Sequence, residues 1–106
     1  MGTIHYNKLV RDGIPKIVRG LGKEVKVRKL SDEEYKKFLF DKLVEESIEA
    51  RDNPSDWEEL ADVVEVVYAI LDFKKIGIQE FQLMRQRKRS DRGGFVDKIL
   101  LESVSD

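Results

Sequence analysis

The stretch that decides the fold runs from Lys42 to Ile70 and reads KLVEESIEARDNPSDWEELADVVEVVYAI. Apolar residues recur every three to four positions on both sides of its DNPS segment, which is the spacing of two amphipathic helices. Pro54 disfavours helical geometry at Asn53, so the first helix is expected to end there. A connection this short predicts that the two helices lie antiparallel.

Sequence patterns at the helix starts set the expected limits of both helices. A capping box is a Ser or Thr followed three residues later by Glu or Gln. Ser31 with Glu34 predicts the start of the first long helix, which should reach about Arg51. Ser55 with Glu58 predicts the start of the second, which should extend to residue 74 or 75.

The remaining segments complete a mainly α prediction. Shorter helices are expected over 14–19 and 78–89, flanked by proline and glycine. The segment EVKVRKL alternates apolar and basic residues as a strand does, and FVDKILLESV is expected to be a closing strand. The predicted fold is an antiparallel helical bundle with a small two-stranded β element, in a single domain spanning residues 1–106.

Composition excludes several functional classes. Charged residues make up 39 % of the 106 residues and nearly balance, with a formal charge of −1, so no general attraction to nucleic acid or anionic lipid is expected. The chain has no cysteine, which excludes disulfides, thiolate zinc sites and cysteine nucleophiles. We expect a soluble cytoplasmic protein without a membrane partner, because no apolar run approaches the roughly 20 residues of a membrane helix.

Four of the nine acids in the quoted stretch fall on or beside the apolar helix faces: Glu46, Glu49, Glu59 and Asp62. Helical residues advance by about 100° each, which places every side chain on a wheel. On that wheel Glu46 lies between Tyr35 and Leu39, whereas Glu45 points away and is expected to be solvated. The four acids form one pair on each helix, with members three residues apart.

A buried carboxylate needs a compensating charge. Basic side chains are one solution, since Lys42 lies close to Glu46 and Glu49 on the wheel. A divalent cation is the other, because Mg²⁺ prefers oxygen ligands and keeps water for a phosphate substrate. The lack of cysteine and of a nearby histidine favours Mg²⁺, or Mn²⁺, over zinc.

Basic residues outside the two long helices suggest contacts with phosphate. Lys88 and Arg92 are four residues apart and can face one phosphate group, and Gly93 lets the backbone approach it closely. Lys8 and Arg11 form a second basic pair near the N-terminus. These segments lack interleaved aromatic residues, so a nucleic acid polymer is not the expected partner.

Three segments in order, YNKLVRDGIP, EESIE with ELADVVEVVYAI, and KRSDRGGF, give the chain a family resemblance. It resembles the MazG-like nucleotide pyrophosphohydrolases, whose signature is EExxE followed by ExxD, and within them a small branch similar to phosphoribosyl-ATP pyrophosphohydrolases. The resemblance implies Mg²⁺-dependent hydrolysis of a nucleoside triphosphate to a monophosphate and pyrophosphate, with house-cleaning of non-canonical nucleotides as the implied role. It also implies a homodimer or homotetramer.

The resemblance places roles on residues matched by motif. Its metal ligands fall on Glu46, Glu49, Glu59 and Asp62, the acids that the wheel selects. Its basic KxxxR pair falls on Lys88 and Arg92, which would contact substrate phosphates and act with Glu46 and Glu49 in catalysis. Lys8, Arg11 and Gly93 are further substrate-binding candidates. Only nine residues separate Glu49 from Glu59, fewer than in many MazG domains, so the identity of the base is not carried over.

Two other functions remain open at this point. One is phosphoribosyl-ATP hydrolysis in histidine synthesis, which uses the same chemistry. The other is a helical interaction module without catalysis, in which the acids pair with lysines and arginines. The residue that takes a proton from the attacking water is also open, with Glu45 and a metal-bound carboxylate as candidates.

Overall fold

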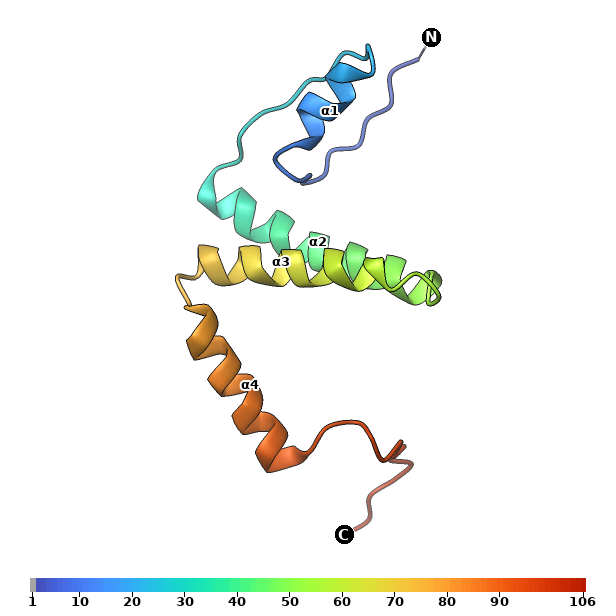
Figure 1. The fold of residues 1–106 in the computed structure, drawn as a ribbon, viewed down its shortest axis with the longest axis vertical. Helices are drawn as coiled ribbons and strands as arrows, with labels where there is room; N and C mark the ends of the chain where they lie inside the picture. The colour runs from blue at the N-terminus through green and yellow to red at the C-terminus, as the bar shows by residue number, and fades with distance from the viewer. Residues whose placement is uncertain (1) are drawn as a thin grey trace.

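Four helices form the structured part of the chain in a computed structural model that describes residues 2–106. They are α1 (Ile14–Gly20), α2 (Asp32–Asp52), α3 (Glu58–Phe73) and α4 (Ile78–Arg92). The long helices α2 and α3 lie side by side and run in opposite directions, as predicted, with α1 above the pair and α4 below it in Figure 1. The architecture is therefore mainly α.

The start of α2 is fixed by the predicted capping box. Ser31 Oγ accepts a hydrogen bond from the backbone N–H of Glu34 at 3.2 Å, and Glu34 Oε1 accepts one from the N–H of Ser31 at 3.2 Å. Arg28 also makes a bidentate contact with the Glu34 carboxylate. Its Nη1 donates to Oε1 at 3.2 Å and its Nη2 donates to Oε2 at 2.8 Å. The guanidinium of Arg28 holds the pKa of Glu34 at about 2.

We predict that Glu34→Gln lowers the thermal stability of the chain at neutral pH and that this difference shrinks in acid. The folded-state pKa of Glu34 is depressed below its ordinary value of 4.5, so the stabilisation is complete above that value and is lost as pH falls through about 2. Circular dichroism melts across this range provide the measurement. Glu33→Gln, in the same exposed turn, is the control for charge alone, and a pH-independent difference for Glu34→Gln would contradict the prediction.

The predicted capping box of α3 is wrong. The helix begins at Glu58, and no side chain caps it from its N-cap residue, Trp57. Residues 54 and 55 form a turn, so Ser55 lies before the helix instead of at its cap. Asp56 takes over part of that role, because its Oδ1 accepts a hydrogen bond from the N–H of Glu58 at 3.1 Å.

The predicted β element is also wrong, since residues 2–106 contain no strand. The segment 24–30 leads into α2, whereas residues 95–104 follow α4 on the other side of the helix pair (Figure 1). Strands need a neighbour for their backbone hydrogen bonds, and neither segment has one there. No helix within residues 2–106 is long and apolar enough to cross a membrane.

The core of the single chain is small. Leu39, only 2 % exposed, packs with Val66 and Ile70 between α2 and α3, and Tyr35 meets Phe73 edge to face at 5.5 Å. The accessible surface is 10079 Å², whereas about 6,100 Å² is usual for a folded monomer of 12.4 kDa. The radius of gyration is 18.4 Å, against about 13 Å for a compact domain. Much apolar surface is thus left uncovered by the chain itself.

Candidate metal centre

The acids selected on the helical wheel lie together on one side of the α2–α3 pair. Carboxylate oxygens of Glu46, Glu59 and Asp62 lie within 4.8 Å of one another, and so do those of Glu45, Glu46 and Glu49. Glu46 belongs to both groups. We call these five residues the acidic cluster.

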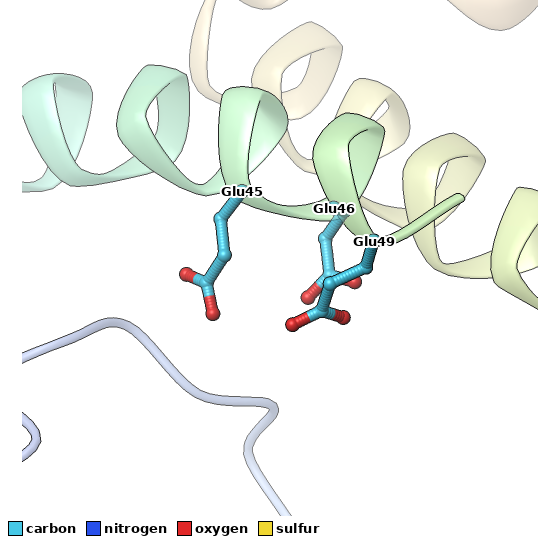
Figure 2. A group of neighbouring side chains, drawn as sticks. All are labelled: Glu45, Glu46 and Glu49. Atoms are coloured by element: carbon cyan, nitrogen blue, oxygen red, sulfur yellow. The ribbon is translucent and has the colours of Figure 1, made fainter. Parts of the chain in front are cut away.

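Helix packing explains how the cluster forms. Glu46 is only 8 % exposed because it lies on the side of α2 that faces α3. Glu59 and Asp62 are half-buried and one turn apart on α3. Figure 2 shows that Glu45, Glu46 and Glu49 leave α2 on the same side and point toward the N-terminal segment. The cluster thus joins two antiparallel helices that were predicted to pair.

The prediction that Glu45 is solvated is wrong. It is half-buried and lies 2.8 Å from Lys8 Nζ, through an Oε1 atom that accepts a hydrogen bond. The wheel of α2 gives no indication of this contact, because Lys8 comes from a segment 37 residues away. Within α2, the only sequence feature that associates Glu45 with the cluster is its position next to Glu46 in EESIE.

Two carboxylates in the cluster are less acidic than usual. Burial raises the pKa of Glu46, and the nearby Glu49 raises it further, while Lys42 acts in the opposite direction. Loss of hydration also raises the pKa of Glu59, with added repulsion from Asp56 and Asp62. The fold therefore holds negative charge here without fully compensating it.

Basic side chains neutralise only part of the cluster. Lys42 Nζ lies 3.3 Å from Glu46 and 3.5 Å from Glu45. The hydrogen bond to Glu45 raises the pKa of Lys8 and lowers that of Glu45.

Arg11 supplies the third cation. Its Nη2 lies 2.7 Å from Asp62 Oδ1, and its Nη1 lies 4.0 Å from Glu65. Lys8 and Arg11 were predicted to bind substrate, and in the structure both lie against the acids. Five acids thus face three bases, which leaves an excess of negative charge when all are ionised.

The basic residues on α4 are not brought to the cluster within one chain. Lys88 and Arg92 are exposed on α4, which leaves the helix pair at the end of α3 remote from Glu59 and Asp62 (Figure 1). Gly93 ends the helix with φ of 85°, and its N–H donates to the carbonyl of Arg89 at 2.8 Å. Arg92 and Gly93 help to line a hollow of about 440 Å³ after α4.

The donor atoms of the cluster suit a hard cation. Both groups offer only carboxylate oxygens, the ligands that Mg²⁺ and Mn²⁺ prefer, and neither contains the nitrogen or sulfur typical of zinc sites. The excess negative charge and the raised pKa of Glu46 favour a cation at this position. The residues present therefore fit a divalent metal.

Comparison with known protein families, with curated proteins and with solved structures finds no match to this chain.

Proposed function

We propose that the chain is a Mg²⁺-dependent nucleoside triphosphate pyrophosphohydrolase, which releases a nucleoside monophosphate and pyrophosphate. The observation that carries the proposal is the position of Glu46. It belongs both to the three clustered acids on α2 and to the cluster that joins α2 to α3, and its pKa is raised. The three MazG-like segments support the reaction class, and non-canonical nucleotides are the proposed substrates. Phosphoribosyl-ATP is the alternative substrate of the same chemistry.

In this proposal Glu46, Glu49, Glu59 and Asp62 hold the cation. A divalent cation held by these carboxylates would supply positive charge that polarises phosphate oxygens and makes water at the site more acidic. Glu45 lies beside the same group and is proposed to accept the proton of the attacking water. The hydrogen bond from Lys8 lowers the pKa of Glu45, so release of Lys8 would make this carboxylate a stronger base. Its closeness to the ligands is the reason to prefer it as the base.

Lys8 and Arg11 are proposed to change partners when substrate binds. They now donate to Glu45 and Asp62 at 2.8 and 2.7 Å. A cation on the acids would compete for those carboxylates, and a triphosphate would offer new anionic oxygens to the released side chains. Lys88, Arg92 and Gly93 are proposed as further phosphate contacts. Because α4 leaves its own helix pair, they would act in a homodimer or homotetramer or after α4 moves.

The proposal is tested by measuring pyrophosphate release from a panel of canonical and non-canonical nucleoside triphosphates with Mg²⁺. We expect turnover of at least one nucleotide, and its loss in Glu49→Gln. No turnover by the wild-type chain, or full turnover by the variant, would refute hydrolysis. Complementation of a histidine auxotroph identifies the phosphoribosyl-ATP alternative.

Arg11→Gln is predicted to bind Mg²⁺ more tightly but to turn over nucleotide more slowly. Removing the guanidinium frees Asp62 for the metal, and an exposed ion pair is worth up to about 1 kcal/mol, or about fivefold in affinity. The same change removes a donor to phosphate. Calorimetry and steady-state kinetics measure the two effects, with Arg19→Gln on α1 as a control. Weaker Mg²⁺ binding by Arg11→Gln would contradict the prediction.

A second candidate function is a helical interaction module without catalysis. The ion pairs Lys8–Glu45 and Arg11–Asp62 favour it, because they tie the N-terminal segment to the helix pair. In such a module the acids are structural. Replacing them would loosen the N-terminal segment, and Mg²⁺ would have no specific site.

A further inference from the structure

Residues 2–12 form a strap that crosses the acidic cluster from one long helix to the other. Lys8 Nζ donates a hydrogen bond to Glu45 Oε1 on α2 at 2.8 Å. Arg11 Nη2 donates one to Asp62 Oδ1 on α3 at 2.7 Å. Between these two contacts, Leu9 packs against the small core that joins α2 and α3. Figure 2 shows the clustered glutamates of α2 pointing toward this segment, so the strap lies over the acids.

The rest of the N-terminal region adds little to the attachment of the strap. Ile4 and Tyr6 are largely exposed, and α1, which follows the strap, has no buried residue. The side chains of Lys8 and Arg11 are about half exposed, and ion pairs at exposed positions are individually weak. Segments with few buried contacts open locally while the remainder of a protein stays folded. The strap is therefore able to lift from an intact α2–α3 pair.

The backbone of Asn7 sets the direction in which the strap enters the cluster. Its φ of 48° lies in the left-handed region, and the chain bends at the next residue, Lys8. Asparagine is one of the few residues with a side chain that tolerate this region, whereas β-branched residues are strongly disfavoured there. The Asn7 side chain is itself exposed, so its contribution to the strap is the bend. Asn7 is thus a positioning residue for the contact of Lys8 with α2.

The strap and a divalent cation compete for the same carboxylates. Arg11 contacts Asp62, which supplies one of the three oxygens that α2 and α3 bring within 4.8 Å of one another. Two positive charges on one carboxylate repel each other, so each weakens the hold of the other. Lys8, Leu9 and Arg11 lie within four consecutive residues. A cation that displaces Arg11 therefore also pulls on the neighbouring contacts, and we expect the strap to leave as a unit.

We propose that residues 2–12 are an autoinhibitory strap, held by Lys8, Arg11 and the bend at Asn7, which keeps the acidic cluster closed until a divalent cation binds. This device regulates the proposed metal centre and rests on it. The whole segment, Leu9 included, lifts from the helix pair with the cation alone, before any substrate is present. By linkage, the cation favours the lifted strap by the same factor by which lifting strengthens cation binding.

Asn7→Val and Asn7→Gly are a matched pair that tests the strap without changing its charges or the acidic cluster. Valine disfavours the left-handed conformation, whereas glycine adopts it freely. Trypsin cleavage after Arg11 measures the lifted population, and cleavage after the exposed Lys98 is the reference within the same chain. We expect cleavage after Arg11 to be at least about fivefold faster in Asn7→Val, since backbone strain of this kind is costly, and within about twofold of wild type in Asn7→Gly. Equal cleavage of the two variants would overturn the strap.

Mg²⁺ alone provides the second test. Saturating Mg²⁺ should speed cleavage after Arg11 in the wild-type chain at least about threefold relative to Lys98, and Asn7→Val should bind Mg²⁺ at least about threefold more tightly by calorimetry. Mg²⁺ binding with unchanged or slower cleavage after Arg11 would overturn the strap and leave the metal centre standing. Binding of Mg²⁺ by neither the wild type nor Asn7→Val would refute the metal centre and the strap together. Binding by Asn7→Val alone would support both.

Discussion

Asp62→Asn is expected to lower pyrophosphate release at least about 100-fold, because metal activation contributes several kcal/mol and each 1.36 kcal/mol is tenfold in rate. Asp62 supplies one of the three oxygens that α2 and α3 bring within 4.8 Å of one another. An amide keeps the shape of the side chain but lacks the charge that the cation needs. The rate at saturating Mg²⁺ and nucleotide is the measurement.

Asp72→Asn is the matched control for this prediction. It makes the same chemical change on the same helix, at an exposed position outside the acidic cluster. Its turnover is expected to stay within about twofold of wild type, as surface changes usually have small effects. Unchanged turnover in Asp62→Asn, or equal losses in both variants, would count against a metal role for Asp62.

Leu39→Ala is expected to cost about 2–5 kcal/mol of folding free energy, as truncation of a fully buried leucine does in well-packed cores. Leu39 is the most buried side chain, packed with Val66 and Ile70. That cost is a large share of the roughly 5–15 kcal/mol by which domains are stable. Urea unfolding followed by circular dichroism measures it, and a loss below about 1 kcal/mol would show that the α2–α3 contact is not the core.

Glu46→Gln, two turns after Leu39 on the same face of α2, is expected to behave in the opposite way. Burial raises the pKa of Glu46, so the folded chain disfavours its charged form at neutral pH, and the neutral amide removes that cost. The metal-free variant should therefore unfold at the same or higher urea concentration than wild type, yet lose turnover. Destabilisation comparable to that of Leu39→Ala would instead make the Lys42–Glu46 pair structural.

Local sequence patterns were sufficient to predict the elements that are stabilised by neighbouring residues or by one apolar helix face. The apolar periodicity of α2 and α3 and the pairing of Ser31 with Glu34 give the central helix pair and the start of α2. They also place Glu46 on the packed face, which is what brings the four acids together.

Features that depend on distant segments could not be predicted in this way. The 24–30 and 95–104 segments have strand-like patterns, but a strand forms only beside a partner that the topology does not bring to them. Glu45 is covered by the N-terminal segment, which no helical wheel includes. The distance of Lys88 from the acids follows from the direction α4 takes after Phe73, and that direction is set by a few backbone angles in residues 74–77.

The most direct test of the proposed metal centre is a calorimetric titration of Mg²⁺ into the full chain and into a variant in which Glu46, Glu49, Glu59 and Asp62 are all replaced by their amides. We expect specific, saturable binding to the wild-type chain and none to the variant, which should retain its helices by circular dichroism. Absence of specific binding to the wild type, or equal binding to both chains, would contradict a metal centre built from these four acids.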